Sequence, residues 1–315
     1  MSLKVIFMGT PEFAVPSLEA LKENGYDIKL CVTQPDKPSG RGNKITYCPV
    51  KAFAIDNNID VLQPETVKTP EFADKLRSYN PDVLITAAYG KILPKDVLEI
   101  APLGCINVHA SLLPKYRGSA PIWWVILNGE SETGVTTMFT DVGMDTGDIL
   151  LCEKIEIDDS INTGELYDKL ADLGAKVLIQ TLKELEEGIL QRKPQDGSIA
   201  TYAPMIKKEM GLIDWAKASK AIHNQVRGLN PWPSAYTFYQ GKRMKIFRTE
   251  LVDSVAVKDI AGRIISVSDK GILVSTGDGA ILITEIQFDS SKRLSVMDYL
   301  RGHNITENVI LGQEY

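Results

Sequence analysis

Alternating apolar and amphipathic runs along the first part of the chain predict a parallel sheet. Short apolar, β-branched runs at residues 3–8, 28–33 and 82–87 are typical of strands, and helical patterns such as residues 71–79 lie between them. Strands that alternate with helices predict a doubly wound, mostly parallel α/β sheet of Rossmann-like type. The longest helical pattern runs over residues 162–188 and ends at a glycine, so we expect the first domain to end there.

The turn after the first strand argues against a dinucleotide site. A Gly-x-Gly-x-x-Gly series is needed where a pyrophosphate approaches the backbone, and Gly9 is followed instead by Thr10, Pro11 and a helical pattern over residues 12–24. We expect Thr10 to cap that helix. A nicotinamide or flavin enzyme is therefore disfavoured.

After residue 189 the pattern changes from helical to strand-like. Residues 190–208 contain two prolines and no apolar periodicity, which is typical of a linker. A helical pattern follows at residues 214–228. The short strand patterns after it cover residues 235–239, 244–250, 263–267, 272–275 and 280–288. They predict a small barrel, of which an OB-like barrel is one form and other small barrels remain open.

The predicted organisation is therefore a Rossmann-like catalytic domain at 1–189, a basic linker at 190–208 and a C-terminal barrel at 209–315. The composition, with 44% hydrophobic and 24% charged residues, is that of an ordinary globular protein. No apolar run approaches the roughly 18 residues of a membrane span, and no signal-peptide pattern precedes the first strand, so we expect a cytoplasmic location.

Four cysteines occur without a Cys-x-x-Cys spacing, and three of them lie in apolar surroundings. We interpret them as reduced core residues, and we predict no metal site.

The net charge of −6 is unevenly distributed: residues 1–189 carry −10 and residues 190–315 carry +4. A basic C-terminal part on an acidic protein favours a polyanionic partner, although a charge of this size also fits an ordinary solvated surface. The loop over residues 34–44 carries Lys37, Arg41 and Lys44 against one anion. It suits contact with nucleic-acid phosphates, and a plain solvated loop is an equal alternative.

The candidate chemistry centres on residues 104–114. Asn107 and His109 are two residues apart in an apolar, strand-like run, so their side chains share one face. A lone histidine in a strand is more often structural, but the glycine-punctuated acidic loop over residues 140–150 can bring Asp145 to the same place. An imidazole, an amide and a carboxylate together suit acyl transfer to an amine. Because neither a Gly-x-Ser-x-Gly elbow nor an activated cysteine is present, we favour direct attack by the amine.

Two of these runs carry a resemblance to a known family. Asn107-Val108-His109-Ala110-Ser111-Leu112-Leu113-Pro114 and Asp141-Val142-Gly143-Met144-Asp145-Thr146-Gly147 resemble the signature of the folate-dependent formyltransferases. The runs at 8–14, 34–42 and 230–233 narrow the resemblance to the methionyl-tRNA formyltransferases within that family. The resemblance covers nearly the whole chain.

The resemblance implies a formyl donor, an acceptor and three catalytic roles. The formyl group of 10-formyltetrahydrofolate passes to the free amine of methionine esterified to initiator tRNA. Asn107 and His109 are expected to polarise the formyl carbonyl and stabilise the tetrahedral oxyanion. Asp145 is expected to orient His109 and to assist proton transfer between the amine and N10 of the folate.

The resemblance also implies binding residues, and we expect a monomer without a metal ion. Expected folate contacts are Tyr89, Gly90, Ser111, Leu112, Leu113, Pro114 and Asp141. Expected tRNA contacts, together with the barrel, are Lys37, Arg41, Lys44, Arg192, Lys207 and Lys208. Phe13 is expected to help form the methionine pocket. Residues 45–48, at the end of the Arg41 loop, match no family role.

Two other functions are weighed against this one. A formyltransferase or hydrolase acting on a small molecule, such as a nucleotide-linked amino sugar, would need neither the Arg41 loop nor a basic linker. A tRNA-binding module with a vestigial catalytic domain is disfavoured because Asn107, His109 and Asp145 are all present.

Overall fold

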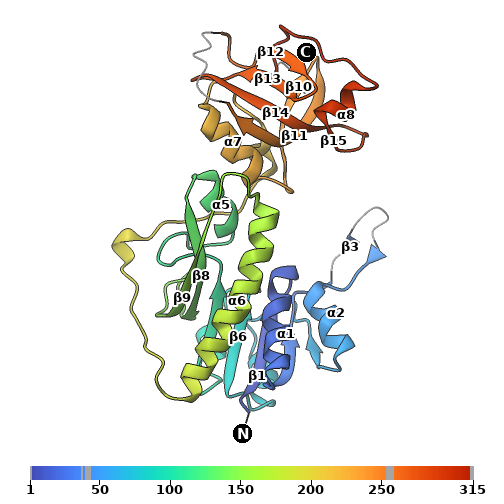
Figure 1. Cartoon of the computed structure of the whole chain (residues 1–315). Helices are drawn as coiled ribbons and strands as arrows, with labels where there is room; N and C mark the ends of the chain where they lie inside the picture. The colour runs from blue at the N-terminus through green and yellow to red at the C-terminus, as the bar shows by residue number, and fades with distance from the viewer. Residues whose placement is uncertain (1, 37, 40–43, 253–258, 313–315) are drawn as a thin grey trace. The chain divides into compact units, whose positions relative to one another are not determined.

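The computed structural model describes residues 2–36, 38–39, 44–252 and 259–312, and the chain divides into two compact units (Figure 1). The first unit is built on a seven-stranded sheet. Its strands, in spatial order, are β5 (Val61–Leu62), β2 (Asp27–Val32), β1 (Lys4–Gly9), β6 (Val83–Ala87), β7 (Cys105–His109), β8 (Glu132–Phe139) and β9 (Ile149–Glu156). The pairs from β5 to β7 are parallel, while β8 and β9 are antiparallel. The predicted doubly wound, mostly parallel sheet is confirmed.

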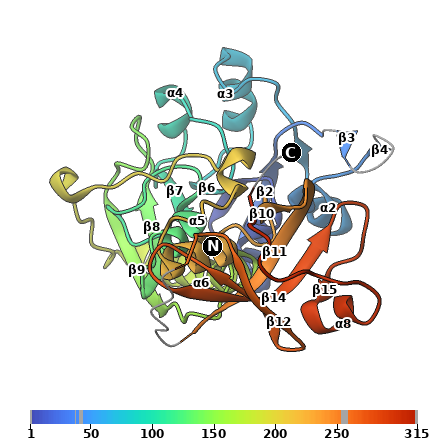
Figure 2. The same ribbon diagram turned by 90° about the horizontal axis from the view of Figure 1, so that it is seen from above.

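Helices cover both faces of this sheet. They are α1 (Val15–Glu23), α2 (Pro49–Asp56), α3 (Pro70–Arg77), α4 (Lys95–Leu98) and α6 (Thr163–Glu186), while α5 (Pro121–Leu127) groups with the second unit from residue 122 onward. One core cluster joins residues of α3 and α4 to the strand residues Leu84 and Cys105, so these helices pack on one face. On the other face, Gly174 of α6 lies so close to Val108 that a Cβ there would come within 2.9 Å of its methyl group. Figure 2 shows α3 and α4 on the side of the sheet opposite α6.

The turn after β1 is shaped by close packing and not by a helix cap. A Cβ at Gly9 would lie 2.7 Å from Ala14 and 2.9 Å from the carbonyl oxygen of Ala87, so only glycine fits there. The expectation that Thr10 caps the following helix is wrong. A 3₁₀ turn at Glu12–Ala14 precedes α1 without a side-chain cap, because the Thr10 hydroxyl accepts the backbone N–H of Gln34 instead, at 3.1 Å.

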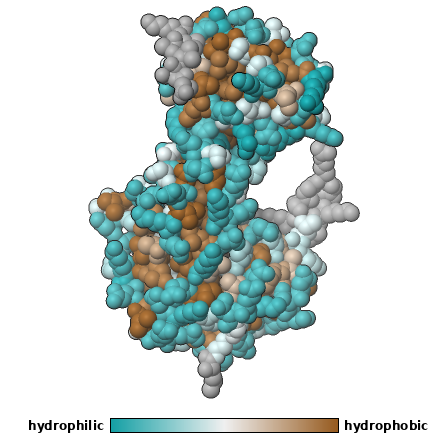
Figure 3. Space-filling view, viewed as in Figure 1, coloured by the Kyte–Doolittle hydropathy of each residue, from teal (hydrophilic) through white to brown (hydrophobic). Residues whose placement is uncertain are grey.

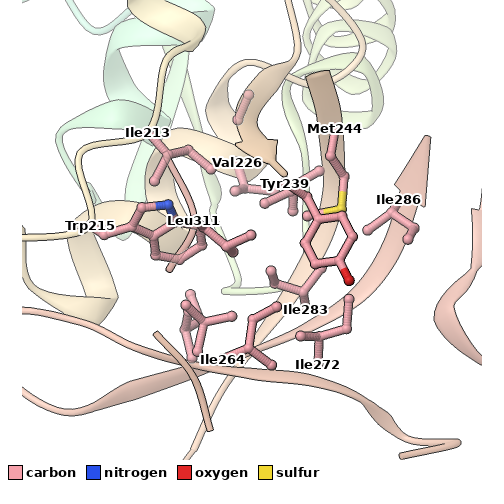
Figure 4. Close-up of a cluster of buried hydrophobic side chains, with 14 of the residues drawn as sticks. Ile213, Trp215, Val226, Tyr239, Met244, Ile264, Ile272, Ile283, Ile286 and Leu311 are labelled. Carbon is pink, nitrogen blue, oxygen red and sulfur yellow. The ribbon is translucent and has the colours of Figure 1, made fainter. Parts of the chain in front are cut away.

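The second unit contains an antiparallel sheet. Its strands are β10 (Ala235–Tyr239), β11 (Lys242–Leu251), β14 (Ala280–Phe288), β13 (Gly271–Ser275) and β12 (Ile264–Ser268), with β15 (Leu294–Ser295) paired to β14. Inward-facing side chains such as Met244, Ile283 and Trp215 form its core (Figure 4). The helices α7 (Ser219–Gly228) and α8 (Val296–Leu300) belong to this unit. A small β domain after the Rossmann-like domain is thus confirmed.

Helix α7 begins five residues later than the sequence pattern indicates. Asp214 accepts the backbone N–H of Lys217 through its carbonyl at 3.2 Å and that of Ala216 through its carboxylate at 3.1 Å. These bonds form a turn in place of a first helical turn, and α7 starts only at Ser219.

The division of the chain differs from the predicted limits of 1–189, 190–208 and 209–315. The first unit continues to Pro204, and residues 122–131 and 157–166 group with the second unit. The segment after α6 belongs to the first unit because its backbone is hydrogen-bonded there. Lys193 and Ile149 exchange two backbone hydrogen bonds, each of 2.9 Å.

The four cysteines are free, as expected, but only two of them are core residues. Cys31 and Cys105 are buried, and burial raises the pKa of each thiol to about 12. Cys48 is partly buried, and Cys152 is exposed because β9 is the edge strand of the sheet. No helix within the described residues is long and apolar enough to cross a membrane. The face in Figure 3 is mostly hydrophilic, with smaller hydrophobic areas between.

Candidate active site

Strand β7 carries the two polar side chains on which the site is built. It lies between β6 and β8, with Asn107 opposite Thr86 of β6 and opposite Met138 of β8. His109 is only 6% exposed, and Asn107 is partly buried. The carboxyl end of a parallel strand is a common position for a ligand site in α/β folds.

The amide of Asn107 is oriented by its neighbour in the sheet. The Thr86 hydroxyl donates a hydrogen bond of 2.8 Å to Asn107 Oδ1. This bond holds the oxygen end of the amide against β6 and turns the Nδ2 donor away from it. No side chain or carbonyl among the described residues accepts a hydrogen bond from Nδ2. Asn107 therefore has a donor that is free to bind a substrate oxygen.

The imidazole of His109 is oriented by a carbonyl group. Nε2 lies 3.1 Å from the carbonyl oxygen of Tyr116, and because a carbonyl only accepts, Nε2 carries a proton. Nδ1 faces Oδ2 of Asp145 at 3.8 Å, which is too long for a hydrogen bond but close enough for the two groups to interact when the ring is protonated. The structure thus brings His109 and Asp145 together, and it is Tyr116 that bonds the ring.

Asp145 and Asp141 lie on the same loop and have different environments. The carboxylate of Asp145 accepts the backbone N–H of Gly118 at 2.8 Å, beside His109. The carboxylate of Asp141 turns back onto its own loop, where it accepts the N–H of Gly143 at 2.9 Å and the hydroxyl of Thr146 at 2.6 Å. Asp141 therefore shapes the loop, while the carboxylate of Asp145 faces His109.

The run from Ser111 to Pro114 forms a fixed turn after β7. The buried Ser111 hydroxyl donates to the carbonyl of Lys115 at 2.7 Å, so it is already used within the turn. Thr136 of β8 donates to the Ser111 carbonyl at 2.7 Å and accepts from the Leu113 N–H at 3.2 Å. Leu113 is buried, and Leu112 and Pro114 are partly buried. The expected folate contacts of this run stay a prediction.

Tyr89 and Gly90 lie just after β6, close to the turn that follows β2. Gln34 donates to the Tyr89 carbonyl at 2.9 Å, and Gly90 has a φ of +77°. The Tyr89 hydroxyl is buried and has no hydrogen-bond partner among the described residues, and burial raises its pKa to about 12. A buried hydroxyl without a partner is uncommon, so Tyr89 is a candidate to bind a ligand.

A cavity of about 650 Å³ opens beside the acidic loop. Its lining comprises Lys95, Leu98, Glu99, Pro102, Leu103, Gly104, Cys105, Phe139, Thr140, Asp141, Val142, Leu185, Leu190 and Arg192. Asp141, an expected folate contact, is among them. Cys105 lies two residues before Asn107 on the same face of β7, so the cavity and the polar group lie along one strand.

The expected tRNA contacts fall into two groups. Lys37 and Arg41 lie outside the described residues, as does the side chain of Lys44, whose backbone forms the short β4 (Lys44–Ile45) paired with β3 (Pro38–Ser39). Lys207 and Lys208 are exposed and form no ion pair among the described residues.

Arg192 has partners of its own in the first unit. Its guanidinium stacks 4.2 Å from the ring centroid of Phe139 and lies 3.2 Å from Asp148. Its charge is therefore less available to RNA than those of Lys207 and Lys208.

The base of the loop that carries Arg41 is anchored by Asp36. Its carboxylate accepts from Lys51 and from Nε2 of Gln63, the latter at 3.0 Å. Burial acts to raise the pKa of Asp36, but these hydrogen bonds outweigh it and hold the pKa below its usual value. The start of the loop is thus fixed to the first unit.

Phe13, the expected methionine-pocket residue, is buried against α6. Its ring meets Tyr167 edge-on, with the centroids 5.4 Å apart, and the Tyr167 hydroxyl accepts the Phe13 N–H at 2.8 Å. Phe13, in the turn before α1, thus contacts Tyr167 of α6. The methionine pocket stays a prediction.

Comparison with known proteins places the chain in a family. A model described as formyl transferase matches residues 3–182, and one described as formyl transferase, C-terminal domain, matches residues 205–304. The methionyl-tRNA formyltransferase of Acetivibrio thermocellus is 56% identical over 99% of this chain and 100% of its own length. That of Ruminiclostridium cellulolyticum is 57% identical over the same shares. The chain belongs to the methionyl-tRNA formyltransferase family.

The fold is also found in more distant relatives. WlaRD, a sugar 3N-formyl transferase whose structure was solved in the presence of dTDP and 5-N-formyl-THF, is 21% identical, with a TM-score of 0.68 over 93% of this chain and 100% of its own. At this identity the likeness shows the shared fold alone. Among the described residues, no group of three or more His, Cys, Asp or Glu side chains is arranged to hold a metal ion.

Sequence reasoning missed the residues that orient the polar side chains of the candidate site. Thr86 could have been found, because a threonine interrupts the apolar run of a buried strand and parallel pairing can bring it beside Asn107. Tyr116 acts through its backbone carbonyl, which leaves no trace in the amino-acid pattern. Arg117 and Gln195 also lie at the site, and neither belongs to a periodic element.

Proposed function

We propose that Asn107, His109 and Asp145 are the catalytic residues of this methionyl-tRNA formyltransferase. The enzyme transfers the formyl group of 10-formyltetrahydrofolate to the amino group of methionyl initiator tRNA. The observation that carries the assignment is the arrangement at the end of β7. A free amide donor, an imidazole with an available Nδ1 and a carboxylate 3.8 Å from that nitrogen are held by separate hydrogen bonds.

The geometry divides the reaction among these groups. The methionine amine attacks the formyl carbon, a C–N bond forms, and negative charge develops on the formyl oxygen. The Nδ2 of Asn107 donates to that oxygen. Because Nε2 of His109 is bound to Tyr116, the ring can donate to the oxyanion only through Nδ1, the nitrogen that faces the Asp145 carboxylate.

Proton transfer completes the reaction. The amine must lose a proton as it becomes an amide, and N10 of the folate must gain one as its bond to the formyl carbon breaks. Asp145 is the carboxylate nearest to His109, so it takes the amine proton and passes it to N10. Since the three side chains are fixed before substrate binds, little reorganisation is needed in the transition state.

The cavity beside the acidic loop is our candidate for the folate ring system. Its volume of about 650 Å³ is within the usual range for small-molecule sites, and its lining is mostly apolar with a few polar and charged groups. It includes Asp141 and Val142 of the loop that carries Asp145. Tyr89, with its unpartnered hydroxyl, supplies a further donor near the end of β6.

The tRNA contacts are assigned to cations that are free to meet phosphates. Lys207 and Lys208 are exposed at the start of the second unit, and the loop bearing Arg41 is anchored at its base by Asp36. A phosphate contact through lysine or arginine positions RNA, while a contact to a base end selects it. We assign initiator selection to Arg41, together with Lys37 and Lys44, and stem binding to Lys207 and Lys208, with Arg192 as a minor contributor.

We further infer that the enzyme acts as a monomer in the cytoplasm. Every group of the catalytic site comes from one chain, so no second copy is needed to complete it. The acceptor is a substrate of translation, which takes place in the cytoplasm. Light scattering coupled to gel filtration should give a mass near 34.8 kDa, and twice that mass would contradict the monomer.

An acceptor competition tests the proposed function. Purified protein is given 10-formyltetrahydrofolate and three acceptors: charged initiator tRNA, charged elongator methionyl-tRNA and a nucleotide-linked amino sugar. We expect formylation of the initiator at least about a hundredfold faster than of either competitor, since selection by a few contacts is worth several kcal/mol. Preferential formylation of the amino sugar would overturn the proposal.

A further inference from the structure

The segment after α6 lies against the catalytic site. Lys193 pairs with Ile149 through two backbone hydrogen bonds. Further along, the Thr201 carbonyl accepts the N–H of Arg117 at 2.9 Å, and the N–H of Ala203 donates to the Arg117 carbonyl at 2.7 Å. Residues 193–203 are thus fixed at both ends to the unit that carries the reaction.

Gln195 lies between these two attachments, and its side chain reaches the loop of Asp145. Nε2 donates to the carbonyl of Asp145 at 2.9 Å and to that of Gly147 at 2.7 Å. Oε1 accepts from Arg117, from Nε at 3.1 Å and from Nη2 at 2.7 Å. Both donors and both acceptor positions of the amide are therefore used.

Arg117 determines which way the amide of Gln195 points. The guanidinium is only 6% exposed and has no carboxylate within 4 Å among the described residues. It carries only donors, so it must face the oxygen of the amide, and the nitrogen must then face the two loop carbonyls. Neither a carboxylate nor an apolar side chain at position 195 can satisfy both neighbours.

The turn that Gln195 holds has an uncommon backbone. Asp145 has a φ of +53°, in the left-handed region that few non-glycine residues occupy and in which aspartate is enriched among them. Gly147 is packed so tightly that a Cβ would lie 1.7 Å from the Phe139 carbonyl oxygen. The position of the Asp145 carboxylate therefore depends on contacts from outside the loop.

We propose that Gln195 is a positioning residue for catalysis: with Arg117 it holds the Asp145–Gly147 turn so that the Asp145 carboxylate faces Nδ1 of His109. Gly118, next to Arg117, adds the hydrogen bond to the carboxylate itself. The segment that leads to the second unit thereby sets the geometry of the reacting groups. This inference rests on the catalytic role proposed above for Asp145.

The main test compares Gln195→Met with Gln191→Met. Methionine keeps the length of the side chain and removes its hydrogen bonds. Gln191 is an exposed glutamine of the same segment without a side-chain hydrogen bond among the described residues, so it is a matched control. We expect Gln195→Met to lower kcat about ten- to a hundredfold, because small misplacements of catalytic groups have effects of that size, while KM for both substrates stays within twofold. Gln191→Met should match the wild type.

A second readout separates positioning from a general loss of structure. The double variant Asp145→Asn/Gln195→Met is compared with Asp145→Asn alone. If Gln195 acts by placing the Asp145 carboxylate, its substitution has no further effect once that carboxylate is gone, so the double variant should have the kcat of Asp145→Asn. A further fall of about ten- to a hundredfold in the double variant would indicate a general loss of structure and contradict positioning.

Gln195→Glu keeps the test decisive if the methionine variant does not fold. It retains a partner for Arg117 but sets a carboxylate against the carbonyls of Asp145 and Gly147, so kcat should fall as in Gln195→Met. If Asp145→Asn is inactive while both position-195 variants keep full kcat, the positioning proposal is wrong. If Asp145→Asn itself keeps full activity, the proposed catalytic role of Asp145 fails instead.

Discussion

Strand β7 and the segment at residues 193–203 hold the same site by different means. In β7, the sheet register places Asn107 beside Thr86, and the two-residue period puts His109 on the same face. The later segment has almost no regular structure, yet its backbone bonds and the amide of Gln195 fix the loop of Asp145. The comparison shows that irregular backbone can be as well determined as a strand when its polar groups are paired.

Removing the polar groups of β7 should have the largest effect. Asn107→Ala and His109→Ala each delete a donor that we assign to the developing oxyanion. We expect the barrier to rise by about 2 to 4 kcal/mol, a fall in kcat of about 30- to 1000-fold. Single-turnover formylation measures it, and tRNA affinity, measured by filter binding, should stay nearly unchanged. A variant with normal turnover would remove that residue from the mechanism.

A smaller effect is expected from substitution of Thr86 in β6, which orients the amide of Asn107 in β7. Thr86→Val keeps the shape of the side chain but removes the hydrogen bond to Asn107 Oδ1, so the amide is free to rotate. We expect a loss of about 1 kcal/mol in kcat/KM, the usual size of one such bond. Thr86→Ser keeps the hydroxyl and should restore most of the activity. Equal defects in both variants would indicate packing and not orientation.

Outside the catalytic site, Arg41→Ala should change selection more than chemistry. Loss of one phosphate or base-end contact reduces the salt dependence of tRNA binding by about one unit of log–log slope and lowers the preference for the initiator, while KM for the folate is unchanged. Lys68→Ala, which removes an exposed cation of the same unit, is the control. An unaltered ratio of initiator to elongator formylation would leave Arg41 without a role in selection.

The smallest effect concerns stability in the second unit. Burial holds the pKa of His223 below its usual value, and its ring bonds Thr249 and the Asp159 carbonyl. The unfolded chain therefore takes up a proton as the pH falls through the ordinary histidine range, before the folded protein does, so stability is lost as the pH falls. Thermal melts at pH 7.5 and pH 5.5 should show a smaller drop for His223→Gln than for the wild type. An equal drop would contradict this.

Strand β7 and its candidate catalytic residues could be predicted because the two-residue period of a strand and the polar residues occur in the same run. Asn107 and His109 interrupt an apolar run at strand spacing, and the acidic loop follows at a distance that suits an antiparallel return. The predicted start of α7 and the predicted helix cap at Thr10 were wrong. Local hydrogen bonds of Asp214 and Gln34 determine the backbone at these two places. Gln195 and the Tyr116 carbonyl could not be predicted, since both depend on contacts across the fold.

The catalytic role of Asp145 is tested most directly by single-turnover formylation with Asp145→Asn. Asparagine keeps the size of the side chain and an oxygen that can accept from Gly118, but it removes the charge beside His109. With both substrates saturating, the account predicts a rate about a hundredfold or more below that of the wild type, with substrate binding retained. A rate within twofold of the wild type would contradict it.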